Sequence, residues 1–166
     1  MIYRESFLLK SRERAVSFHD ITDQVREILV RSGIKEGIVV AYSHHTTCSL
    51  ITQERAFDLS MTGLETLEQD LVNVLEKMIP TCRCEGMYLH PGPQALRFAE
   101  EHGEDNFGCH NTDAHLRSSI IGRSVTIVIA GGEMDLGEFG RVQFIDFDQT
   151  RARTRTVQVM VMGETA

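Results

Sequence analysis

The stretch Ser124–Met162, SVTIVIAGGEMDLGEFGRVQFIDFDQTRARTRTVQVMVM, decides the class of fold. It contains three runs of apolar and β-branched residues, and glycines separate the runs where turns are needed. The runs are Ser124–Ala130, Val142–Phe147 and Thr156–Met162. In the last run valines alternate with Gln158, Met160 and Met162, which is the period of a strand with one face on a core. The sequence therefore predicts a β-sheet in this part of the chain.

Both strands and helices are predicted ahead of this stretch. The expected strands are Tyr3–Lys10 and Ile38–Tyr42, and the expected helices cover residues 22–32, 64–78, about 94–101 and 114–121. Asp20 or Thr22 can cap the first helix, and Gly33 is placed to end it. No repeat or linker divides the 166 residues. We therefore expect one α+β domain over residues 1–166, with mostly antiparallel sheet layers and two main helices.

Composition excludes several classes of protein. A chain of 166 residues buries roughly 70% of its unfolded surface, so disulfides are not needed for stability. No stretch approaches the ~20 apolar residues of a membrane helix, and no secretory signal is recognisable, so we expect a cytoplasmic protein with no membrane partner. The net charge of −7 repels phosphate backbones and disfavours nucleic-acid binding. Arg151, Arg153 and Arg155, however, alternate along a strand-like segment and could together hold a small phosphorylated ligand.

The four cysteines favour a reduced, structural role. No pair has the CxxC spacing, and the close pair Cys82 and Cys84 is poorly spaced for chelation. A nucleophilic Cys48 or Cys109 is disfavoured, because no activating pattern surrounds either residue.

Histidines are the main candidates for chemistry. His45, His90 and His115 come from separate segments that a fold can bring together, and three imidazoles with an open position suit a divalent metal ion. His44 adjoins His45 at the end of a strand, so the two side chains are expected on opposite faces. Asn111 or Asp113 can orient a histidine, although Asp113 can equally be the N-cap of the following helix. The sequence alone leaves both roles of Asp113 open.

Four segments together resemble the YjbQ family, also called UPF0047 or the secondary thiamine-phosphate synthase family. They are HTTCSL at 45–50, YLH at 88–90, NTDAHLRSSIIGRSVTI at 111–127, and Leu136-Gly137 ahead of a strand that ends in Phe147-Asp148. The resemblance spans nearly the whole chain. It implies a compact α+β homotrimer with a pocket lined by His45, His90 and His115, in which metal ions are suspected. It also implies a transferase that joins hydroxymethylpyrimidine diphosphate to thiazole phosphate and releases diphosphate.

This reaction assigns expected roles to several residues. His45, His90 and His115 are expected as metal ligands or phosphate contacts, and Asn111 and Asp113 as catalytic supporting groups. The expected anion contacts are Arg117, Arg123, Arg151 and Thr47. Three imidazoles suit a zinc-like ion, whereas diphosphate chemistry usually uses magnesium on carboxylates, so the metal stays open. Two alternatives also stay open: a metal-dependent hydrolase of a small phosphorylated substrate, and a non-catalytic trimer that binds a small anion or metal.

The chain departs from the family pattern at a few positions. Acidic residues of the family are missing near Leu59 and Gly63, and Gly-Thr-Trp-Gln is replaced by Gly137-Glu138-Phe139-Gly140. Asp146 stands in place of a glutamate, and Gln149-Thr150 replaces Gly-Pro. A different substrate is expected if these positions contact it.

Overall fold

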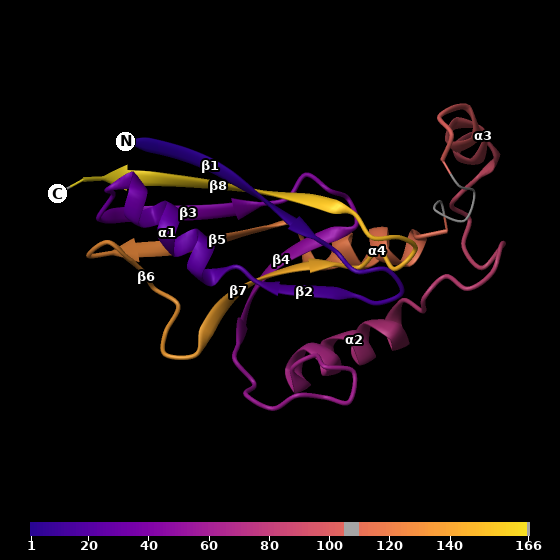
Figure 1. The fold of residues 1–166 in the computed structure, drawn as a ribbon, viewed down its shortest axis with the longest axis horizontal. Coiled ribbons are helices and arrows are strands. Elements are labelled where there is room, and N and C mark those ends of the chain that lie inside the picture. The colour runs from indigo at the N-terminus through magenta and orange to yellow at the C-terminus, as the bar shows by residue number, and fades with distance from the viewer. Residues whose placement is uncertain (105–109, 166) are drawn as a thin grey trace.

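The computed structural model describes residues 1–104 and 110–165, in which the strands form two antiparallel sheets (Figure 1). The larger sheet has the strand order β1-β8-β3-β5-β6 and the smaller sheet the order β2-β7-β4. The strands are β1 (Ile2–Lys10), β2 (Ser17–Asp20), β3 (Glu36–Tyr42), β4 (Cys48–Glu54), β5 (Ser124–Ala130), β6 (Glu133–Met134), β7 (Gly140–Asp146) and β8 (Thr154–Glu164). The helices are α1 (Thr22–Ser32), α2 (Thr66–Met78), α3 (Pro93–Glu101) and α4 (Thr112–Ile121).

Strand β8 organises the larger sheet because it pairs with β1 on one side and with β3 on the other. Gly37 and Gly163 face each other where β3 and β8 begin their pairing. A Cβ atom on Gly37 would lie 2.0 Å from the Met162 carbonyl oxygen, and one on Gly163 would lie 1.9 Å from that of Glu36. The two strands can therefore approach this closely only because both positions are glycine.

The main core lies between the two sheets and α1. Val157, Val159 and Val161 of β8 are fully buried there, as their alternation predicts. Val25, Ile28 and Leu29 complete the core from α1, and Gly33 ends that helix in the left-handed conformation, as predicted. The N-cap of α1 is Ile21, so the expectation that Asp20 or Thr22 caps this helix is wrong, although Asp20 Oδ1 accepts the Thr22 amide at 3.0 Å.

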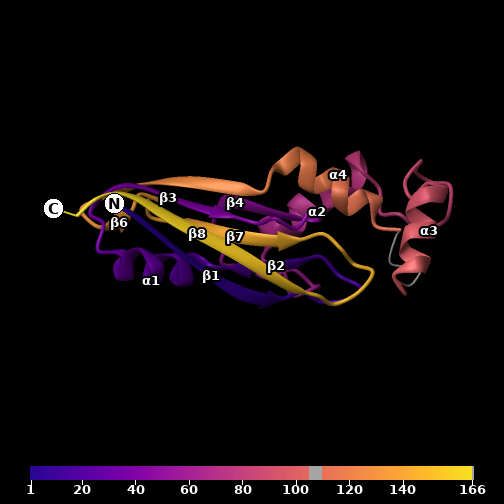
Figure 2. The ribbon, with the colours of Figure 1, turned by 90° about the horizontal axis from the view of Figure 1, so that it is seen from above.

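A second core fixes α2 and α4 to the opposite face of the smaller sheet. Leu75 of α2 and Ala114 of α4 pack there with Ile145 and Phe147. Helix α3, in contrast, lies at the far end of the molecule, away from both sheets and from the two chain ends (Figures 1 and 2). Among residues 1–104 and 110–165, no helix has the length and apolar character needed to cross a membrane.

The structure corrects several details of the predicted elements. Strands β2, β4 and β6 were not among the expected strands. Strands β2 and β6 are too short to give a clear alternation. Helix α4 begins at Thr112, and its N-cap is Asn111. The expectation that Asp113 is the N-cap is therefore wrong, because Asp113 already lies in the first turn.

Candidate functional site

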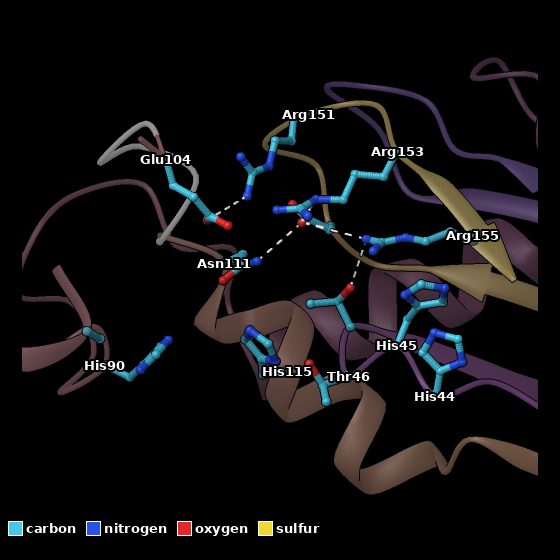
Figure 3. A pocket seen from close by; sticks show the side chains of 13 residues that line it. His44, His45, Thr46, His90, Glu104, Asn111, His115, Arg151, Arg153 and Arg155 are labelled. Carbon is cyan, nitrogen blue, oxygen red and sulfur yellow. Dashed lines mark hydrogen bonds and ion pairs between the residues drawn. The ribbon is translucent and has the colours of Figure 1, made fainter. Parts of the chain in front are cut away.

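A cavity of about 370 Å³ opens where the C-terminal end of β7 meets the N-terminal end of β8 (Figure 3). Four segments that are distant in the sequence line it: the turn after β3, the segment around α3, the start of α4, and the segment that leads into β8. The lining residues are His44, His45, Thr46, Thr47, His90, Ala95, Glu104, Asn111, His115, Asp148, Arg151, Arg153 and Arg155. The cavity therefore combines four histidines with three arginines.

Arg155 is held rigidly at the base of the cavity. Its side chain is buried against Asp146, with Nε–Oδ2 and Nη2–Oδ1 distances of 2.6 and 3.1 Å, and Nη2 also donates to Thr47 Oγ1 at 3.0 Å. Although burial works against the charge, the hydrogen bonds to Asp146 raise the pKa of Arg155. Arg155 is therefore a fixed cation. Its position is determined by β7, by β8 and by the turn after β3.

Arg151 and Arg153 extend the positive lining toward α3. Arg151 pairs with Glu104 at 3.0 Å, and Arg153 Nε lies 3.6 Å from Asp148 Oδ2. Asn111 donates to the same Asp148 oxygen at 3.2 Å. The Nε atoms of Arg151 and Arg153 are buried and have no hydrogen-bond partner in the described part of the chain. Each guanidinium is thus paired with a carboxylate of the lining, and its buried Nε leaves one donor unsatisfied, which costs free energy.

His45 has a defined tautomer. Its Nε2 accepts a hydrogen bond from the Thr156 amide at 2.9 Å, so the neutral ring carries its proton on Nδ1. Burial, Arg155 and His44 all lower the pKa of His45, which keeps the ring neutral at pH 7. His45 is thus a hydrogen-bond donor, and its Nε2 lone pair is already used.

His44 lies beside His45, with ring centroids 4.2 Å apart, and lines the same cavity. The expectation that the two side chains would point to opposite faces is wrong. Strand β3 ends at Tyr42, so the alternation of a strand does not reach these residues.

His115 projects from α4 and forms an edge-to-face pair with His90, with ring centroids 5.7 Å apart. Burial and the neighbouring His90 lower the pKa of His115. A hydrogen bond to the Thr46 backbone acts in the opposite direction, because it favours the charged ring. If one ring nitrogen donates to the Thr46 carbonyl, the other presents a lone pair. His115 thus keeps one free lone pair, but its lowered pKa makes the ring harder to protonate than a free imidazole.

The described residues do not fit the expected metal ion. No group of three His, Cys, Asp or Glu side chains among residues 1–104 and 110–165 is arranged to hold one. Figure 3 shows His90 and His45 on opposite sides of His115, and the Nε2 atom of His45 is bonded to the Thr156 amide. The three imidazoles line one cavity without meeting at one point.

Three of the sequence-predicted residues lie outside the cavity. Arg117 is buried, where its Nη2 contacts Glu76 Oε2 and the Ile79 carbonyl oxygen, both at 2.7 Å. Asp113 accepts the Cys82 amide at 3.1 Å. Arg123 donates to the His44 carbonyl at 3.3 Å and does not line the cavity. Arg117 and Asp113 thus connect α4 to the segment that follows α2. From there Arg117 cannot contact an anion in the cavity, and Asp113 does not line it.

Six residues selected from the sequence line the cavity, and their roles stay predictions: Thr47, Asn111, Arg151, His45, His90 and His115. Sequence reasoning did not select His44, Glu104 or Asp148. The alternating arginines gave a signal for Arg153 and Arg155. No pattern in the sequence assigns Asp148 to the cavity; it contacts the nearby Thr150 and Arg153 and, from a distant segment, Asn111. Burial raises the pKa of the Cys48 thiol far above neutral pH, which removes it as a nucleophile. Cys109, the other thiol considered, lies outside the described residues.

The departures from the family pattern fall in three places. Asp146, in place of a glutamate, is the carboxylate that holds Arg155. Phe139 and Gly140 line a separate cavity at the opposite end of β7. Leu59 is exposed, and Gly63 has a φ of 84° in the loop before α2.

Comparisons with known proteins give one consistent result. A family model described as "UPF0047 protein YjbQ-like" matches residues 6–164. A UPF0047 protein of Archaeoglobus fulgidus is 30% identical over 152 residues, covering 92% of this chain and 97% of that protein. The fold is similar to that of a YbjQ-like protein of unknown function from Sulfolobus solfataricus, with a TM-score of 0.73, 21% identity and 99% of each chain covered. A hypothetical protein of Aeropyrum pernix has a TM-score of 0.71 and 27% identity, with 98% of this chain and 99% of that one covered.

Proposed function

The chain belongs to the UPF0047 (YjbQ-like) family, and from that premise we propose that it is an enzyme that acts on a small phosphorylated substrate in the cavity around Arg155. The observation that carries this proposal is the convergence of Arg151, Arg153 and Arg155 on a cavity that four histidines also line. Guanidinium groups present several N–H donors in a fixed plane, which matches the oxygens of phosphate.

The reaction we propose is the thiamine-phosphate synthase type. The thiazole nitrogen attacks the methylene carbon of hydroxymethylpyrimidine diphosphate, and a new C–N bond forms while the C–O bond to diphosphate breaks. The electron pair of that bond leaves with the diphosphate. Arg151 and Arg153 would neutralise the charge that develops on the leaving group, and the Nδ1–H of His45 would donate to one of its oxygens. This route uses no metal ligand set, in agreement with the geometry of the histidines.

A hydrolase is the second candidate, and the arrangement of His115 favours it. The ring nitrogen of His115 that is not engaged with the Thr46 backbone would accept a proton from water. The water oxygen would attack a phosphorus atom, and the P–O bond to the leaving alcohol or phosphate would break with its electron pair on the leaving group. The third candidate is a binding protein, which would show affinity for phosphorylated molecules without turnover.

We also propose that the protein assembles as a homotrimer through the outer face of the larger sheet. Ile2, Leu8 and Val128 are 68%, 67% and 57% exposed on strands of this sheet. Val40 and Met160 line a further cavity on neighbouring strands β3 and β8. A Val128→Glu substitution should give monomers in sedimentation experiments, because it places a charge in this apolar face.

One assay separates the three functional candidates. The protein is incubated with hydroxymethylpyrimidine diphosphate, with and without thiazole phosphate, and thiamine phosphate and diphosphate are measured. Thiamine phosphate formation supports the synthase, and release of diphosphate without thiazole phosphate supports the hydrolase. Binding without either product supports the binding protein. Arg153→Gln should reduce the observed activity, while Arg97→Gln, on the exposed surface of α3, should not.

A further inference from the structure

A second cavity, of about 470 Å³, lies at the end of β7 remote from the cavity around Arg155, which is called the phosphate cavity below. Gly140 and Arg141 at the start of β7 line it, whereas Asp146 at the end of the same strand holds Arg155. A strand of this length spans roughly 20 Å, so the two cavities are separate sites. The remaining lining comes from the start of α1 and from the segments after β4 and before β7.

An aromatic pair forms one wall of this second cavity. The rings of Phe57 and Phe139 meet edge to face at a centroid distance of 6.0 Å, yet they are 64% and 44% exposed. Phe57 has a φ of 62°, a left-handed conformation that disfavours a bulky residue. The Ala56 amide, bonded to Glu65 Oε2 at 3.0 Å, and the Arg55 amide, bonded to the Phe139 carbonyl at 3.0 Å, hold this backbone in place. A strained backbone that keeps a phenyl ring in solvent points to a binding role.

Arg55 lies over the Phe57 ring and forms no ion pair with a carboxylate in the described part of the chain. The guanidinium carbon of Arg55 lies 5.1 Å from the centre of the Phe57 ring. Of the other arginines in the lining, Arg26 pairs with Asp23, and Arg141 pairs with Asp20 at 3.2 Å and with Glu65. Within the part of the chain that the structure describes, Arg55 forms no such pair. Its charge is therefore available to a ligand.

We propose that this second cavity binds a small aromatic carboxylate, whose ring packs on Phe57 and Phe139 and whose anionic group pairs with Arg55. Stacking on phenyl rings favours a flat ring over an aliphatic one. Asp20, Asp23 and Glu138 also line the cavity, and their charge disfavours a doubly charged phosphate relative to a single carboxylate. This site is independent of the proposed transferase activity.

The test is a titration of the full-length protein with 2-naphthoate, followed by amide chemical shifts in NMR spectra. The expected result is saturable shifts at residues 55–57 and 138–141 that excess inorganic diphosphate does not displace. Cyclohexanecarboxylate and naphthyl phosphate should bind at least about tenfold more weakly than 2-naphthoate.

Two variants and two matched controls make the test specific. Arg55→Gln removes the cation, and Phe57→Gly removes the ring at a position where glycine suits the backbone, so the fold is retained. Each should weaken 2-naphthoate binding about tenfold or more. Arg97→Gln and Phe98→Ala, which change exposed residues of α3, should leave binding unchanged. Absence of saturable shifts, equal binding of cyclohexanecarboxylate, or unaltered affinity in Arg55→Gln would each overturn the proposal.

Discussion

Asp146→Asn tests whether the base of the phosphate cavity is built as described. Asp146 is completely buried, and its two oxygens accept hydrogen bonds from Arg155 at 2.6 and 3.1 Å. The substitution keeps the shape of the side chain but leaves the buried guanidinium without its main counter-charge. Removal of one partner of a buried ion pair costs about 3–5 kcal/mol. Asp148 Oδ2 lies 3.7 Å from Arg155 Nη2 and offsets part of the loss, so we expect about 3 kcal/mol.

Urea unfolding at pH 7 measures this change. With a denaturant slope of about 2 kcal/mol per molar urea, a loss of about 3 kcal/mol lowers the midpoint by about 1.5 M. The matched control is Asp23→Asn, which breaks the exposed pair with Arg26 and should change stability by less than about 1 kcal/mol. A change in Asp146→Asn no larger than that of the control would refute the buried pair and, with it, the fixed position of Arg155.

Three further results are expected. Because burial and His90 lower the pKa of His115 below its ordinary value of 6.5, the folded state resists protonation, so the stability of the wild type falls as pH drops below 6.5. His115→Gln should lose less stability between about pH 8 and about pH 5 in urea unfolding, and an equal loss would contradict the shift. Iodoacetamide should label exposed Cys84 in the folded protein and leave buried Cys48 unmodified until urea is added, as mass spectrometry of peptides can verify. EDTA should not alter the affinity for diphosphate measured by calorimetry, and a loss that zinc or magnesium restores would show that a metal takes part.

A helix or strand could be predicted where a local pattern of buried residues marks its bounds. The alternating valines of β8 and the apolar stripe of α1 gave nearly correct bounds, because the period of buried positions is a local property. Strands β2, β4 and β6 were not predicted. Strands β2 and β4 are defined by pairing with the distant strand β7, and β6 has only two residues.

The candidate site was predictable in composition but less so in geometry. One cavity is lined by four of the residues selected from the sequence: His45, His90, His115 and Arg151. Arg117 looked equivalent to Arg151 as a cation, yet the contacts with Glu76 and Ile79 place it elsewhere. The loss of the Nε2 lone pair of His45 to the Thr156 amide is equally invisible in the sequence, because it depends on a backbone group 111 residues away.

We propose that three arginines make the histidine-lined cavity a site for phosphorylated molecules. Calorimetric titration of inorganic diphosphate in the presence of EDTA tests it most directly, with wild type, Arg153→Gln and Arg97→Gln compared under the same conditions. We expect the wild type to bind one diphosphate per chain. Arg153→Gln should bind diphosphate at least about tenfold more weakly than the wild type, and Arg97→Gln should bind it equally well. No saturable binding, or the same affinity in all three proteins, would contradict it.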